Sequence, residues 1–171
     1  MTQTAFDITP YLDRSEGAHF ERNSLWAGEP GSKRPRDRKT VRNQIAEYVA
    51  GLANAEGGVL LLGVEDDGTV TGHGYPAKVV EKMLRVPADR LEPPQVAGFR
   101  AEVSGHEVLV FDVPMAFGPV QVVGDGYPLR VGDQTVPASF EQIQTLKSYG
   151  LVDSFEARQS PCQLADLDAT L

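Results

Sequence analysis

The sequence is poor in the residues that build covalent and metal-based frameworks: it has one cysteine, Cys162, and three histidines among 171 residues. A single cysteine excludes an internal disulfide and a cysteine-cluster zinc site. The histidines are scattered, so no histidine-rich metal site can be predicted. A chain with so little cysteine is expected in a reducing, cytoplasmic environment.

Long apolar runs are also missing. No stretch approaches the length of a membrane span, and the N-terminus lacks the basic start and apolar block of a secretory signal. The sequence has no phosphate-binding loop of the G-x-x-x-x-G-K-[ST] type, so no nucleotide cofactor is expected. With 41% hydrophobic and 23% charged residues, the composition is that of a soluble globular domain.

Positive charge is scarce overall but concentrated locally. The formal net charge is −8, which argues against a protein that coats nucleic acid with its whole surface. Six cations nevertheless lie within ten residues, with one aspartate among them, and predict a positive patch that could bind nucleic acid. The alternative is a solvated loop and helix start. This basic cluster consists of Lys33, Arg34, Arg36, Arg38, Lys39 and Arg42.

Helical and strand patterns alternate irregularly along the chain. This favours an α+β fold with a mixed, mostly antiparallel sheet and flanking helices. Residues 1–15 are expected to be a loose lead-in in which Pro10 breaks any helix. The main domain is expected over 16–155, with 156–171 as a tail or the start of a further region. Strands are predicted at 19–26, 59–64, 69–71, 99–103, 107–113, 119–123 and 127–131, and helices at 39–54, 77–84 and 139–149.

Carboxylates are the remaining candidates for chemistry. Asp66 and Asp67 follow the buried strand 59–64, in a turn that Gly68 favours. Glu16 and Glu21 flank the start of the first strand, and they could converge with the aspartates if the two strands are neighbours. Three convergent carboxylates would suit Mg²⁺ or Mn²⁺, which could assist cleavage of a phosphodiester. The alternative is a set of solvated surface acids.

Three segments together resemble one known family. They are EGAHFER (16–22), ANAEGGVLLLGVEDDGTVTG (53–72) and YPLRVGDQTVPASFEQIQTL (127–146). The second matches nearly all of a glycine-rich pattern, A-F-A-N-T-x-G-G-x-L-x-I-G-V-x-D-x-G-x-I-x-G. On these motifs the chain resembles the Schlafen AlbA_2 domain, in the version found in bacterial proteins, over roughly residues 10–155.

The resemblance implies the α+β AlbA_2 fold and a catalytic set. Some Schlafens cut tRNA or rRNA with two glutamates and an aspartate, using Mg²⁺ or Mn²⁺. By position, Glu16 and Glu21 match the glutamates, and Asp66 or Asp67 matches the aspartate, with Glu16, Glu21 and Asp67 as the expected metal ligands. One departure weighs against catalysis: Asn23 stands where the family has a lysine beside the acids.

Three functions follow. The first is a nucleic-acid-binding domain, for RNA or DNA, based on the basic cluster and the family. The second is a metal-dependent endoribonuclease acting on structured RNA such as tRNA. The third is a non-catalytic regulatory or interaction domain. Eukaryotic Schlafens join two such lobes around a U-shaped, positively lined cleft, so a single domain could supply both halves as a homodimer. No membrane partner is expected.

Overall fold

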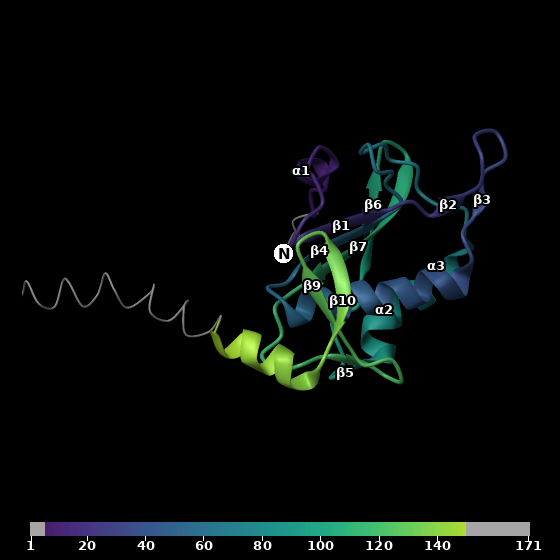
Figure 1. Cartoon of the computed structure of the whole chain (residues 1–171). Coiled ribbons are helices and arrows are strands. Elements are labelled where there is room, and N and C mark those ends of the chain that lie inside the picture. The colour runs from purple at the N-terminus through teal and green to yellow at the C-terminus, as the bar shows by residue number, and fades with distance from the viewer. Residues whose placement is uncertain (1–5, 150–171) are drawn as a thin grey trace, which may run out of the picture.

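The computed structural model describes residues 6–149 and is built on one four-stranded sheet (Figure 1). The order of strands in the sheet is β1-β4-β7-β6. β1 runs parallel to β4, and the other two pairings are antiparallel. The predicted mixed, mostly antiparallel sheet is therefore confirmed. The strands are β1 (Phe20–Asn23), β4 (Gly58–Leu62), β6 (Phe99–Val103) and β7 (His106–Val113).

The central strand β4 is buried on both faces. Leu60 and Leu62 belong to the larger hydrophobic core beneath the helices. Val59 and Leu61 alternate with them and pack in a second core, which includes Ile8 of the N-terminal segment. The apolar run over 59–64 follows from this position, because side chains on both faces of the strand are removed from water.

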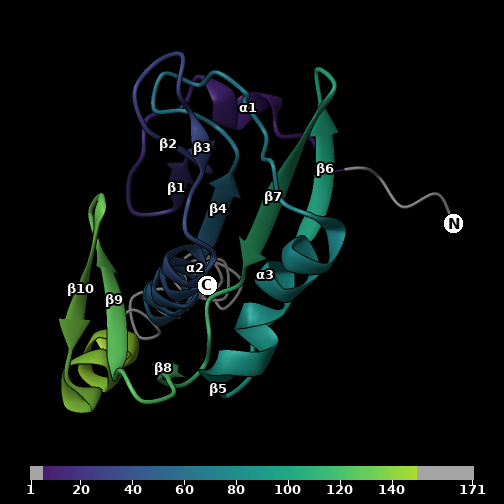
Figure 2. The same ribbon diagram turned by 90° about the vertical axis from the view of Figure 1, so that its right-hand side faces the viewer.

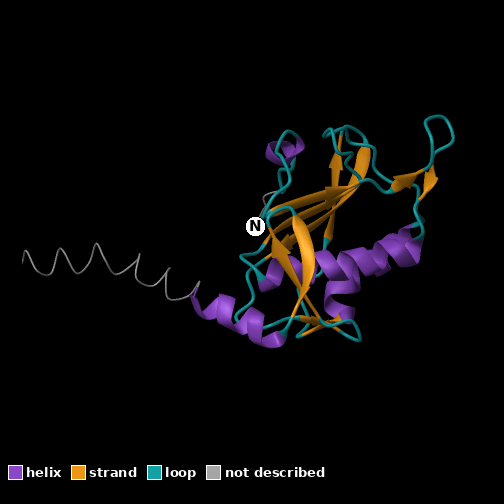
Figure 3. Cartoon of the chain, in the orientation of Figure 1, coloured by secondary structure: helices purple, strands orange, loops and turns teal. Residues whose placement is uncertain are grey.

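Two helices cover one face of the sheet: α2 (Arg38–Asn54) and α3 (Ala77–Arg90) (Figure 3). The apolar stripe of α2 is buried at Val41, Ile45, Val49 and Leu52. α2 ends as predicted, because the Gly57 N–H bonds to the Leu52 carbonyl at 2.8 Å and Gly57 has a φ of +79°.

Smaller elements complete the domain, and Figure 2 shows how they surround the main sheet. A helix over residues 140–149 follows the last strand, with Ser139 as its N-cap: the Gln142 N–H donates to Ser139 Oγ at 3.1 Å. The remaining strands form three two-stranded pairs: β2 (Trp26–Ala27) with β3 (Arg34–Pro35), β5 (Leu91–Glu92) with β8 (Gln121–Val122), and β9 (Tyr127–Val131) with β10 (Gln134–Ala138).

The N-terminal lead-in differs from the prediction. It contains a short helix, α1 (Thr9–Leu12), with Pro10 in its first turn. Proline is tolerated there because the first N–H groups of a helix have no intrahelical partner. Ile8, immediately before α1, is 2% exposed, so the lead-in covers the second core of the sheet.

Several predicted elements have other bounds, and the strand predicted at 119–123 is reduced to the two residues of β8. The strand at 19–26 is divided into β1 and β2. The predicted helix at 77–84 continues to Arg90, because buried Val86 and Pro87 favour its extension through packing. The strand predicted at 69–71 is a single bridge between Val64 and Val70. The predicted boundary at residue 155 and the tail lie outside the described residues. In the described part of the chain, no helix has the length and apolar character needed to span a membrane.

Candidate nucleic-acid interface

The basic cluster lies where the β2–β3 hairpin leads into α2. Four of its members, Lys33, Arg34, Arg38 and Lys39, are exposed. Within residues 6–149, no member of the cluster forms an ion pair with a carboxylate. The charge of the four exposed side chains is therefore directed to solvent, although the chain as a whole carries a net negative charge.

The start of α2 adds to this positive potential. Asp37 caps the helix, with Oδ2 accepting from the Thr40 N–H and from Thr40 Oγ1, both at 2.9 Å. These bonds, led by the backbone bond from Thr40, lower the pKa of the Asp37 carboxyl. The first turn itself holds no acid but contains Arg38 and Lys39. Cations at the positive end of a helix dipole reinforce its field, which attracts anions.

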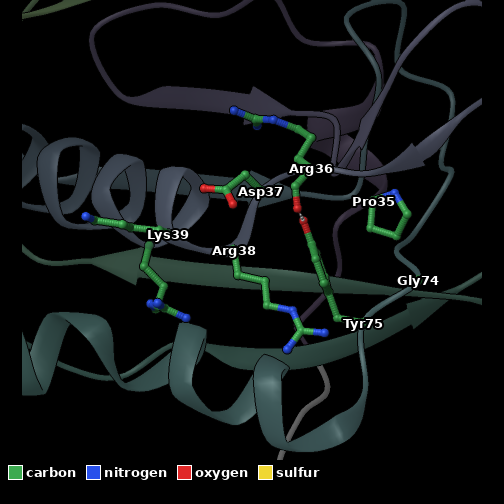
Figure 4. Close-up of a pocket in the computed structure, with 8 residues that line it drawn as sticks. Pro35, Arg36, Asp37, Arg38, Lys39, Gly74 and Tyr75 are labelled. Atoms are coloured by element: carbon green, nitrogen blue, oxygen red, sulfur yellow. Dashed lines mark hydrogen bonds between the residues drawn. The ribbon is translucent and has the colours of Figure 1, made fainter.

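Four members of the cluster line an open hollow beside Tyr75: Arg36, Arg38, Lys39 and Arg42 (Figure 4). Figure 4 shows Arg38 extending from the first turn of α2 toward the side where Tyr75 lies. The Tyr75 hydroxyl donates to the Arg36 carbonyl at 2.6 Å, which fixes the ring against the end of the hairpin. Burial raises the pKa of the Tyr75 phenol, so it stays neutral as a donor. The hollow thus combines exposed cations, Arg38 and Lys39, with a fixed aromatic wall.

Arg36 differs from its neighbours in the cluster. Its guanidinium donates to the Ser24 carbonyl at 3.0 Å and to Gln44 Oε1 at 2.5 Å. The side chain therefore joins the segment after β1 to α2. The sequence predicts Arg36 as a binding residue, but the structure gives it a bridging position within the fold.

The predicted acids do not form one site. Glu21 is buried and pairs with Arg130, whose Nη2 lies 2.6 Å from Glu21 Oε2. Its other oxygen accepts from Asn23 Nδ2 at 3.1 Å. Burial raises the pKa of Glu21, and this effect outweighs the lowering by the Arg130 hydrogen bond. Both oxygens of Glu21 are already engaged by protein groups.

Asp66 and Asp67 lie beside the Arg22 side chain, on the face of β1 opposite Glu21, whereas Glu16 contacts the Arg22 backbone. Glu16 is exposed, and its Oε1 accepts from the Arg22 N–H at 3.1 Å. Asp66 uses its backbone carbonyl to accept from Arg22 Nη2. The carboxylate of exposed Asp67 accepts from the Thr69 N–H at 2.9 Å, and its bonds with Thr69 lower its pKa.

The predicted metal set of Glu16, Glu21 and Asp67 is therefore not assembled. Between residues 6 and 149, no three His, Cys, Asp or Glu side chains are grouped closely enough to hold a metal ion. The physical reason is the alternation of β1, which directs Glu21 to Arg130 and leaves Asp67 to stabilise its own turn. The carboxylates present do not fit Mg²⁺ or Mn²⁺ in this arrangement.

Arg130 is the residue that sequence reasoning missed. It lies on β9, its side chain is 1% exposed, and it donates to the Gly17 carbonyl at 3.1 Å and the Phe20 carbonyl at 3.2 Å. It provides the cation beside Glu21 that Asn23 cannot. The signal in the sequence was the arginine within the segment Tyr127–Val131, a charged residue in an otherwise apolar strand.

The sheet, its two covering helices and the terminal hairpin define an α+β domain with a basic edge at the start of α2. The family model described as "Schlafen, AlbA_2" matches residues 30–139. The chain therefore belongs to the Schlafen AlbA_2 family, and the resemblance seen in the sequence is confirmed.

One solved structure agrees on the fold. The chain is similar to the DIP2311 protein from Corynebacterium diphtheriae, with 21% identity and a TM-score of 0.58 over 76% of this chain. The match covers 24% of that protein, so this chain spans about a quarter of its length. It also matches the N-terminal domain of a RecG-related protein from Nitrosomonas europaea, with 26% identity and a TM-score of 0.44, over 65% of this chain and 74% of that domain. No significant match was found among curated proteins.

Proposed function

We propose that this domain binds nucleic acid, RNA or DNA, through the exposed members of the basic cluster. The observation that carries the proposal is the set of unpaired cations at the start of α2, on a chain whose net charge is −8. Cations without protein partners can neutralise phosphates and release the counterions condensed around them. Family membership supports the same function.

The hollow beside Tyr75 suggests how the contact is made. A phosphate near Arg38 and Lys39 would also meet the positive end of α2. Contacts of this kind recognise the backbone rather than a base sequence, so we expect weak sequence preference and strong dependence on salt.

The test is a triple variant, Arg34→Ala with Arg38→Ala and Lys39→Ala. These residues have no ion-pair partner in the described chain, so the fold should be retained. Affinity for duplex DNA and for single-stranded RNA should fall at least about tenfold at 50 mM salt, and the slope of log K against log salt should flatten by about two to three. Fluorescence anisotropy with labelled oligonucleotides measures both.

A matched control replaces exposed Arg14, Lys82 and Arg85, which changes the net charge equally outside the cluster. Equal losses in the two triple variants would assign binding to overall charge and overturn the proposed surface. Arg36 is left intact because its bonds to Ser24 and Gln44 belong to the fold.

Metal-dependent cleavage of RNA is a second candidate. It would require the acids to rearrange around the metal ion, because the described carboxylates form no metal site in this arrangement, and one observation favours it. Glu16 lies close enough to Glu21 that its charge contributes to raising the Glu21 pKa. Incubation of structured RNA with Mn²⁺ tests the activity directly. Glu16→Gln is the informative variant, because Glu16 is exposed and its loss leaves the Glu21–Arg130 pair in place. Cleavage that Glu16→Gln abolishes would support this function. An absence of cleavage, with nucleic-acid binding retained, would leave a non-catalytic regulatory domain.

A further inference from the structure

Strand β6 forms one outer edge of the main sheet (Figure 2). Its only strand partner among residues 6–149 is β7, joined through the turn at Ser104 and Gly105. Both turn residues have positive φ, +53° and +78°, as in a two-residue hairpin turn of type I′. In such a hairpin the flanking residues, Val103 and His106, form a hydrogen-bonded pair.

Hydrogen-bonded pairs alternate along an antiparallel ladder, so the hairpin fixes which groups face outward. Val103, Ala101 and Phe99 direct their N–H and C=O groups to β7. Arg100 and Glu102 direct theirs to the open edge. Within the described residues no hydrogen bond from outside the sheet reaches the backbone of either one. The strand contains no proline, and its charged side chains are exposed.

We propose that β6 pairs with β6 of a second copy of this chain, antiparallel about a two-fold axis at Ala101. In that register Arg100 lies opposite Glu102 of the second copy, and Glu102 lies opposite its Arg100. The outward N–H and C=O groups of these two residues then meet in four hydrogen bonds. A two-fold interface must be self-complementary, and this five-residue strand satisfies that condition in charge and in hydrogen bonding.

The charges on β6 of a single chain favour a second copy as the partner of this edge. Glu102 is paired across the β6–β7 hairpin with Glu107, a like charge, and has no ion-pair partner in the described chain. Arg100 reaches Glu107 instead, at 3.4 Å. A second copy would bring a cation opposite Glu102, and opposite charges in facing positions stabilise a sheet whereas like charges destabilise it.

The side chains on the other face of β6 are also compatible with this pairing. Phe99 and Val103 would lie opposite each other across the axis, and aromatic and β-branched residues make favourable cross-strand pairs. Phe99 is 36% exposed in the single chain and packs edge-on against Phe6. Pairing would extend the sheet to eight strands and would end the exposure of an open edge, which otherwise invites aggregation.

Charge exchange tests the register. Glu102→Arg places Arg100 opposite an arginine, and Arg100→Glu places a glutamate opposite Glu102. By sedimentation equilibrium the wild type should dimerise, and each single variant should dimerise roughly tenfold or more weakly. An equimolar mixture of the two variants should recover the dimer, since every facing pair is then of opposite charge.

Glu102→Pro is a second variant that removes an outward N–H without removing a bond to β7, so the hairpin should persist while dimerisation is lost. Glu141→Arg, an exposed change of the same charge elsewhere, should leave dimerisation unchanged. A wild type that remains monomeric, or a dimer that Glu102→Arg does not weaken, overturns the inference. The measurements contain no nucleic acid, so their outcome is independent of the function proposed for the basic cluster.

Discussion

The arginines of this domain fall into two groups with opposite environments. Arg22 and Arg130 are 8% and 5% exposed, and their guanidinium groups are bonded to carbonyls and carboxylates of the fold. Arg34 and Arg38 are exposed and have no ion-pair partner within residues 6–149. Identical side chains thus serve the fold in one region and face solvent in the other. Burial and partners, rather than residue type, separate the two roles.

The largest expected effect concerns Arg130. Arg130→Ala leaves Glu21 buried without its counter-charge and removes the bonds that hold β9 to the start of β1. Breaking a buried pair in this way costs about 3–5 kcal/mol of unfolding free energy. Urea denaturation followed by circular dichroism measures it. Arg34→Ala should change stability by less than about 0.5 kcal/mol. If the two variants are equally stable, the division between buried and exposed arginines fails.

A smaller effect is expected from the titration of Glu21. Because burial raises its pKa in the fold, the folded state binds more protons than the unfolded state between the ordinary and the raised pKa. Its contribution to stability is therefore present at low pH and is lost as pH rises through the raised pKa. The unfolding free energy of the wild type minus that of Glu21→Gln should fall as pH rises over this window. A constant difference would show that Glu21 does not titrate differently in the fold.

The smallest expected effect concerns Asp37, the one acid within the basic cluster. Asp37→Ala removes the cap of α2 and should lower the Tm slightly. It should also strengthen nucleic-acid binding roughly two- to fivefold, because one repulsive surface charge is lost. The lowered pKa of Asp37 means that its stabilising effect is present at neutral pH and lost as pH falls through that value. Thermal melts measure the expected fall in Tm, and anisotropy titrations measure the expected gain in affinity. Weaker binding would contradict the proposed interface.

The regular elements of the domain could be predicted because local patterns determine them. α2 has an apolar stripe at helical spacing, and β4 is a continuous apolar run. Alternate residues of β4 pack in two separate cores, which explains why this strand has no polar face. The hairpin of β6 and β7 follows from the Ser104-Gly105 turn. The α+β fold could therefore be predicted from the sequence.

The role of the acids could not be predicted, because it depends on long-range contacts. Glu21 meets Arg130, which is 109 positions away in the chain, and this partner changes a candidate metal ligand into part of a buried pair. Asn54, matched only as part of a family motif, donates to the carbonyls of Val120 and Pro128, at 2.7 Å each. No periodicity within α2 indicates these bonds.

The contacts of Arg130 also bear on how the chain acquires its structure. They link residues near the start of the domain to a strand near its end, with separations of 109 to 113 positions. Contacts between distant residues require closure of a long loop and slow the search for the native state. During synthesis, the carboxylate of Glu21 on the first strand can gain its partner only after Arg130 has been made. We therefore expect folding to end, rather than begin, with the closing of this pair.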